Sequence, residues 1–476
     1  MLKILVLISL VMLPLNVIAT SSKAKVSTIN DQNDMAITIY NQDLALVKDT
    51  RSVNLDRAFN QLAWREVSAR MQPETALLRN LTNPTGFRLK EQNFDFDLLT
   101  PQKLLEKYTN KDITVIRTNP STGEETREKA TVLATNAGVV LKFSDRIETG
   151  IPGRLAFPGV PENLRDKPTL VASFISPAQG KQNLELSYLT TGLSWQADYV
   201  AELNKQDSHL DLTGLVTLTN QSGTTYPNAQ LQLVAGDVNR VHQPRIVSRK
   251  KRGMVAEMAQ DTAMRNEALF EYHLYTLQHT TTLADNQTKQ VALMSATHIP
   301  VNKTFLLRGD NYYYSGQYGD IGHKLKVGVF IKFQNKGKGL GIPLPKGIIR
   351  VYKKDQQGNA QFLGEDQIDH IPDNELIQLK LGNAFDLTAE KKQTDFKKLA
   401  GAVQHSYLFE TAYQIILKNA KKEAVTIAIQ EPIPGDWTMV SESQAHVKAA
   451  SHLAEWKISI PAESEATLTY RVRIKI

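Results

Sequence analysis

The sequence predicts a mainly β fold, in which a large antiparallel β-sandwich module follows a small β-domain and an SH3-like small barrel, with little helix. The last residues, EATLTYRVRIKI, alternate apolar and polar side chains from Ala466 to Ile476. A strand with one buried and one solvated face has this pattern. Short alternating runs recur from about Met35 and are separated by polar turns, which is typical of antiparallel sandwiches.

The composition excludes several classes of function. The chain has 476 residues, a formal net charge of +7 and no cysteine. Without cysteine there is no disulfide framework, no thiol nucleophile and no thiolate metal site. The 56 basic and 49 acidic side chains nearly balance, so we expect no nucleic-acid partner.

Residues 1–19 have the pattern of a signal peptide. Lys3 precedes an apolar run over residues 4–13, and Val-Ile-Ala19 suits cleavage after Ala19. The run is interrupted by Pro14 and is short for a membrane span, which needs roughly 20 apolar residues. An uncleaved anchor is the alternative. No later stretch is long and apolar enough for a spanning helix, so we expect a soluble protein exported to the periplasm.

Residues 20–95 and 96–168 are expected to form the first two domains. In the first, two alternating runs flank Asn41-Gln42-Asp43, which predicts strand, turn and strand. In the second, Thr100 is a natural N-cap and Pro101 suits the first helical position. About five short strands follow this helix, which favours an SH3-like barrel.

Residues 169–476 are expected to form the sandwich module. Between residues 195 and 203 every second side chain is apolar, which predicts a half-buried strand. YQIILKN and AVTIAIQ flank residues 420–423, which predicts a hairpin. Residues 244–270 depart from the strand pattern, and we interpret them as a mobile loop or helical insertion.

No coherent catalytic set is visible, and we predict no cofactor. Gly192-Leu-Ser194-Trp-Gln196 lacks the final glycine of a nucleophile elbow, and Ser248-Arg-Lys-Lys251 lacks the companion motifs of a penicillin-binding site. The glycines of residues 337–341 precede prolines instead of a phosphate-loop helix.

We also predict no metal site. The densest cluster of possible ligands, in residues 364–372, suits a solvated strand better than a metal centre. Met254, Met258 and Met264 could suit copper(I), but methionines at loosely helical spacing more often pack apolar surface.

Two sets of residues are candidates for binding. The first is a basic run that could meet anionic envelope groups, although such runs are often only solvated: Arg249, Lys250, Lys251 and Arg252. The second is an aromatic set near glycines, as on protein- or carbohydrate-binding surfaces: Tyr312, Tyr313, Tyr314 and Tyr318. Consecutive tyrosines in a strand point to alternate sides and cannot all be buried on one face, so we expect at least one ring to be exposed. The other interpretation is that the rings are buried on both sides between packed sheets.

The phrases YLTTGLSWQADYVAELN, GLGIPLPKGIIRVYKKD, LGNAFDLTAEKKQTDF and EPIPGDW resemble a bacterial family, domain of unknown function 4139. Its named relatives are the mucoidy-inhibitor-A-like proteins, which carry a long coiled coil that has no counterpart in this sequence. The resemblance implies export in Gram-negative bacteria and a β-rich module without an established activity. It supplies no catalytic residues.

From these features we expect a non-catalytic periplasmic binding or scaffold protein of the cell envelope. Its partner would be an envelope protein or a glycan or lipid surface. One alternative is an envelope glycan-active hydrolase or transferase with unrecognised carboxylates. A second alternative is a metal-handling protein.

Overall fold

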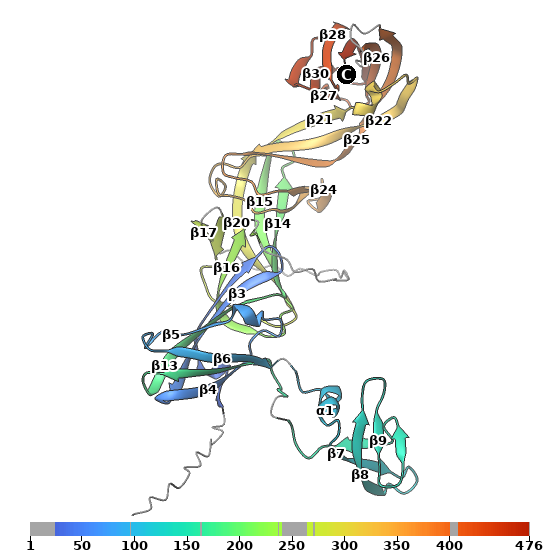
Figure 1. The fold of residues 1–476 in the computed structure, drawn as a ribbon. Helices are drawn as coiled ribbons and strands as arrows, with labels where there is room; N and C mark the ends of the chain where they lie inside the picture. Colours follow the sequence, from blue (N-terminus) through green and yellow to red (C-terminus); the bar gives the residue numbers. More distant parts are fainter. Residues whose placement is uncertain are drawn as a thin grey trace, which may run out of the picture. The chain divides into compact units, whose positions relative to one another are not determined.

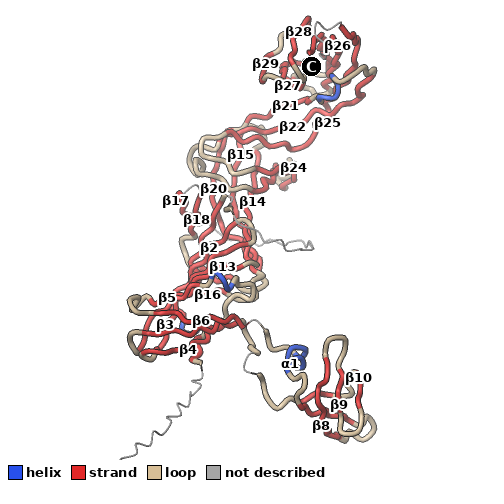
Figure 2. Tube along the Cα trace, viewed as in Figure 1, coloured by secondary structure: helices blue, strands red, loops and turns tan. Residues whose placement is uncertain are grey.

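The computed structural model confirms the mainly β fold class (Figures 1 and 2). It describes residues 24–95, 97–161, 164–236, 238–239, 264–269, 272–399 and 408–475. The predicted signal peptide and the basic run at residues 249–252 lie outside the described residues. Within the described residues, no helix is long and apolar enough to cross a membrane.

The chain divides into two compact units. Unit 1 takes residues up to Ile37, Leu46–Thr191 and Ser222–Ala229. Unit 2 takes Thr38–Ala45, Gly192–Gln221 and the residues from Gln230 onward.

A four-stranded sheet of unit 1 has the order β1-β4-β12-β6. Its strands are β1 (Lys25–Ser27), β4 (Ala58–Arg65), β12 (Thr169–Ser176) and β6 (Arg88–Asp95). β12 pairs antiparallel with both β4 and β6. Strands on the two sides of residues 96–168 therefore share one sheet, and the predicted domain limits at 95 and 168 do not end it.

Residues 101–156 of unit 1 form the predicted helix and five strands. Helix α1 (Pro101–Lys107) begins as predicted, because the Thr100 side chain accepts a hydrogen bond from the backbone N–H of Lys103. The strands are β7 (Asp112–Thr118), β8 (Glu125–Ala134), β9 (Val140–Lys142), β10 (Ile147–Thr149) and β11 (Arg154–Ala156). Their order, β10-β9-β8-β7-β11, is that of an open sheet rather than a closed barrel.

An eight-stranded sheet has the order β17-β18-β16-β2-β3-β13-β5, with β19 paired to β16. Its strands are β2 (Gln32–Tyr40), β3 (Leu44–Leu55), β5 (Leu77–Asn80), β13 (Gly180–Thr190), β16 (Tyr226–Ala235), β17 (Arg265–Leu269), β18 (Tyr272–Thr276) and β19 (Thr281–Leu283). The predicted turn at Asn41-Gln42-Asp43 joins β2 to β3. Of the insertion predicted at residues 244–270, the structure describes residues 264–269. Residues 265–269 form strand β17, so the helical interpretation is wrong for this part.

A five-stranded sheet of unit 2 has the order β20-β15-β14-β23-β24. Its strands are β20 (Gln287–Pro300), β15 (His209–Asn220), β14 (Leu193–Leu203), β23 (Gly347–Lys354) and β24 (Ala360–Ile368). The apolar face predicted for β14 is buried. β14 and β23 run parallel, so this sheet is not purely antiparallel.

A nine-stranded sheet completes unit 2, in the order β28-β31-β26-β25-β22-β21-β27-β30-β29. Its strands are β21 (Asn302–Arg308), β22 (Asp320–Gln334), β25 (Leu376–Leu399), β26 (Leu408–Asn419), β27 (Val425–Pro432), β28 (Asp436–Glu442), β29 (Val447–Ala450), β30 (Leu453–Ile460) and β31 (Ser464–Lys475). The buried apolar side chains of these strands form one core, as in a sandwich. Alternate residues of β31 are buried, as the terminal sequence predicts.

The predicted hairpin at residues 420–423 is wrong. β26 pairs with β25 and β31, whereas β27 pairs with β21 and β30. The Asn419 side chain donates hydrogen bonds to the carbonyls of Glu423 and Pro461, at 2.9 and 2.8 Å, and so fixes the connection between two separated strands. Pairing with distant strands outweighs the local turn, because it places the alternate apolar side chains of both strands in the common core of the nine-stranded sheet.

Three short 3₁₀ helices complete the described elements: η1 (Ile29–Asp31), η2 (Pro73–Thr75) and η3 (Asn311–Tyr314).

Candidate functional site

The consecutive tyrosines lie in the 3₁₀ helix η3, not in a strand as expected. Tyr313 and Tyr314 are buried, whereas Tyr312 is 52% exposed, which confirms that at least one ring faces solvent. Tyr318 is 37% exposed, and its ring meets that of Tyr312 edge to face with centroids 6.1 Å apart. We call Tyr312 and Tyr318 the tyrosine pair.

A buried ion pair lies against the rings of Tyr313, Tyr314 and Tyr413. Lys391 Nζ on β25 and Glu431 Oε2 on β27 are 2.6 Å apart, and each side chain is 1% exposed. The ammonium lies 4.3 Å from the ring centroid of Tyr313 and 4.7 Å from that of Tyr413, which stabilises the cation. Burial lowers the pKa of Lys391, and the Glu431 carboxylate opposes that shift.

The tyrosine hydroxyls complete the hydrogen bonds of this cluster. Tyr314 donates to Glu431 Oε2 at 2.8 Å and lies 2.8 Å from the Tyr470 hydroxyl, while Tyr413 donates to the Tyr313 carbonyl at 2.6 Å. Burial raises the pKa of Tyr413 to about 12, so this phenol is neutral at physiological pH. The charged groups of this cluster are therefore satisfied by contacts within the chain. The cluster acts as a rigid support for η3.

Gly309 is required beside this cluster. A Cβ atom at Gly309 would lie 2.3 Å from Glu431 Oε2, well inside contact distance. Any other residue would displace the carboxylate that pairs with Lys391.

Gln393 holds the loop that carries Tyr318. Its amide donates to the Gly316 carbonyl at 3.0 Å and to Thr411 Oγ1 at 2.9 Å, and its carbonyl oxygen accepts from the backbone N–H of Tyr318. The buried Gln393 side chain thus fastens the loop to β25 and β26, so the tyrosine pair is presented in a fixed geometry.

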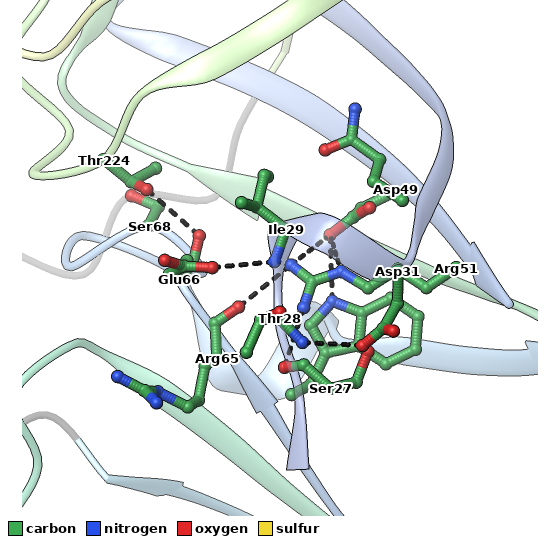
Figure 3. Close-up of polar contacts among 12 residues, drawn as sticks. Ser27, Thr28, Ile29, Asp31, Asp49, Arg51, Arg65, Glu66, Ser68 and Thr224 are labelled. Carbon is green, nitrogen blue, oxygen red and sulfur yellow. Dashed lines mark hydrogen bonds and ion pairs between the residues drawn. The ribbon is translucent and has the colours of Figure 1, made fainter. Parts of the chain in front are cut away.

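Unit 1 contains a second buried polar cluster (Figure 3). Arg51 Nη2 lies 2.8 Å from Asp49 Oδ2, and the guanidinium also donates to the carbonyls of Ser27 and Arg65 at 3.0 and 2.9 Å. Trp64 Nε1 donates to the same Asp49 oxygen at 2.9 Å. Arg51 on β3 thereby ties β3 to the ends of β1 and β4, which indicates a structural role.

Asp49 should make the stability of unit 1 depend on pH. Its second oxygen, Oδ1, is buried and has no hydrogen-bond partner in the described part of the chain. Burial raises the pKa of Asp49 above its ordinary value of 3.8, although the Arg51 charge opposes the shift. The folded protein then keeps the Asp49 proton at pH values where the unfolded chain has lost it. Between the two pKa values, its contribution to the free energy of unfolding falls as pH rises.

Urea unfolding of the native protein and of Asp49→Asn, at several pH values from about 4 upward, measures this effect. We expect the native protein to lose stability relative to the variant as pH rises. A relative gain would show that Arg51 outweighs burial and lowers the pKa.

The carboxylates of residues 364–372, which the sequence analysis considered as possible metal ligands, instead contact other residues of the chain. Glu365 pairs with Arg350, Asp366 accepts from the backbone N–H of Lys380, and Asp369 pairs with Lys346. In the described residues, no group of three or more histidine or carboxylate side chains is placed to hold a metal ion. Of the three methionines, Met264 is buried and the other two lie outside the described residues.

The sequence analysis missed Lys391 and Glu431, although a signal for the lysine exists. Leu387, Ala389, Lys391 and Gln393 alternate along β25, and all four are buried. A lysine in phase with an apolar face indicates a buried charge that needs a partner.

The Lys391–Glu431 ion pair and the tyrosine pair both lie in a segment whose sequence matches a known family. Residues 184–476 match the model of a family described as "Domain of unknown function (DUF4139)". The chain belongs to this family. The match covers more than half of the chain and includes the five-stranded and nine-stranded sheets of unit 2. No curated protein matches the chain.

Proposed function

We propose that this DUF4139 protein is an exported, non-catalytic binding or scaffold protein of the cell envelope, and that the tyrosine pair contacts a protein partner in the periplasm. The observation that carries the proposal is an exposed aromatic pair on a rigid support. Tyr312 and Tyr318 are partly exposed, while the loop between them is fastened by buried Gln393.

Tyrosine suits this role because it offers a large contact area with few rotatable bonds. Tyr and Trp are enriched among the interface residues that contribute most to binding energy. A loop that is already ordered loses little conformational entropy on binding, so more of the contact energy appears as affinity.

The non-catalytic part of the proposal is supported by the buried cluster around Lys391 and Glu431. Lys391 and Glu431 have the chemistry of a catalytic acid and base, but they contact each other and the tyrosines, with 1% exposure each. The buried Lys391 and Glu431 side chains therefore stabilise the fold around the loop, and a substrate cannot reach them.

Affinity purification of the tagged protein from envelope extracts tests the proposal. We expect the double variant Tyr312→Ser, Tyr318→Ser to recover at least about tenfold less of the partner than the native protein does, because two central aromatic contacts are lost. Gln393→Ala should weaken recovery less, because it loosens the loop but keeps both rings.

The matched control is Phe385→Ser, which removes a 96% exposed aromatic ring from the same nine-stranded sheet. It should leave recovery unchanged. Equal recovery with the double tyrosine variant and the native protein would overturn the proposed surface.

A further inference from the structure

An exposed carboxylate lies at the start of the loop that carries the tyrosine pair. Asp310 directly precedes η3 and is exposed, and its side chain does not cap the helix. Among the described residues, no hydrogen bond or ion pair uses its carboxylate. Its charge still acts on η3, because burial raises the pKa of Tyr313 and the nearby negative charge of Asp310 adds to that shift.

The Tyr313 ring connects Asp310 to the tyrosine pair. Its centroid lies 4.4 Å from that of Tyr312, and Tyr312 in turn meets Tyr318 with the two ring planes at 79°. The Tyr318 hydroxyl lies 2.9 Å from Ser315 Oγ, which donates to the Tyr312 carbonyl at 2.7 Å. The carboxylate and the two exposed rings therefore belong to one ordered surface.

The buried rings of η3 show which ligand such a group of side chains holds. Lys391 Nζ lies 4.3 and 5.3 Å from the ring centroids of Tyr313 and Tyr314. Glu431 supplies its counterion at 2.6 Å. Tyrosine rings and a carboxylate thus hold a cation inside the protein. The exposed side of η3 offers the same two kinds of group, and no cation of the described residues lies over its rings.

This surface therefore favours positive charge. The faces of aromatic rings are negative and attract cations, as the Asp310 carboxylate does. An anion would be repelled by both groups, and an apolar segment would cover the carboxylate without giving it a counterion. Arginine fits better than lysine, because a planar guanidinium stacks on a ring and can donate two hydrogen bonds to a carboxylate.

We propose that the tyrosine pair and Asp310 bind an arginine side chain of the protein partner. The guanidinium packs against the exposed rings and pairs with the carboxylate of Asp310. Arginine is also enriched among the residues that contribute most to binding energy at protein interfaces. The inference rests on the proposed function, since it names the chemistry that the same surface recognises.

Fluorine NMR of the full chain, with 3-fluorotyrosine in place of Tyr318, tests this chemistry without the partner. The probe is N-acetylarginine amide, and its neutral isostere N-acetylcitrulline amide is the comparison at equal ionic strength. We expect a saturable shift with the arginine probe, with a Kd of about 1–10 mM for a single side chain, and binding at least about threefold weaker with citrulline. Equal binding of the two probes, or no saturable shift with arginine, would overturn the inference.

Variants then assign the binding to this surface. Asp310→Asn removes the charge but keeps the shape, and Tyr312→Leu removes one ring. Each should weaken binding of the arginine probe about threefold, the effect of losing one exposed ion pair or ring contact. Glu463→Gln is the matched control, because Glu463 is an exposed carboxylate between β30 and β31 of the same sheet, and it should leave binding unchanged. Unchanged affinity in both Asp310→Asn and Tyr312→Leu would contradict the assignment.

Affinity purification from envelope extracts separates this inference from the proposed function. Asp310→Asn should recover about threefold less of the partner than the native protein, whereas Glu463→Gln should recover as much. If the double tyrosine variant loses the partner while Asp310→Asn retains it fully, the tyrosine pair is the interface but arginine recognition is refuted. If both variants retain the partner, the proposed surface itself is refuted.

Discussion

Replacing Glu431 with Gln is expected to lower the free energy of unfolding by about 3–5 kcal/mol, because it leaves the Lys391 charge buried without its counterion. The carboxylate is 2.6 Å from Lys391 Nζ and both side chains are 1% exposed, so water cannot replace the lost partner. Urea unfolding followed by circular dichroism measures the change. The deficit should shrink as pH rises toward the ordinary lysine pKa, because the folded variant then releases the Lys391 proton more readily than the unfolded chain does.

Two comparisons make this prediction specific. The double variant Lys391→Met, Glu431→Leu replaces both charges with apolar groups and should recover most of the lost stability. Glu465→Gln breaks an exposed pair with Lys418 on the same sheet and should cost less than about 1 kcal/mol. If Glu431→Gln and Glu465→Gln cost the same, the buried pair does not stabilise unit 2 as we infer.

Replacing Arg51 with Met should destabilise unit 1 by a similar amount, about 3–5 kcal/mol, because Asp49 is left as an unpaired buried charge. The carbonyls of Ser27 and Arg65 would also lose their donors. Since a chain with two units need not unfold in one step, hydrogen exchange of β1, β3 and β4 is the appropriate measurement.

Arg51→Lys should rescue little of this loss, because one ammonium cannot reproduce the planar set of donors that Arg51 directs at three acceptors. Arg473→Met is the matched control, since Arg473 is an exposed residue paired with Glu410. Faster exchange confined to unit 1 in Arg51→Met supports a structural role. Unchanged exchange in β3 would refute it.

The parts of the fold that depend on local pattern were predictable from the sequence. The strand at residues 464–475 buries alternate side chains because the apolar period of two fits one face of a sheet. Helix α1 begins at Pro101 because Thr100 caps it and proline lacks only an N–H that the first turn does not use. The same reasoning located the turn between β2 and β3 and the buried face of β14.

The pairing of distant strands was not predictable in this way. The two alternating runs on either side of residues 420–423 have the pattern of a hairpin. These runs are β26 and β27, yet each pairs with other strands and not with the other. Likewise β12 pairs with β4, more than a hundred residues earlier. Local patterns specify which residues are buried, whereas the choice among apolar partners depends on packing of the whole unit.

The candidate site was predictable only in part. The four tyrosines were predicted from their clustering near glycines in the sequence, but their division into two buried and two exposed rings follows from the turn of η3 and the Gln393 contacts. Lys391 and Glu431 are 40 positions apart, so their pairing depends on the order of β25, β22, β21 and β27 in the sheet.

Site-specific photocrosslinking in the cell is the most direct test of the proposed binding function. A photoreactive residue is placed at Tyr312, and separately at Lys457, an exposed position on β30 of the same sheet. We predict one reproducible adduct with an envelope protein from position 312 and none of that mass from position 457. Only self-adducts from position 312, or the same adducts from both positions, would contradict the proposal that the tyrosine pair binds a specific partner.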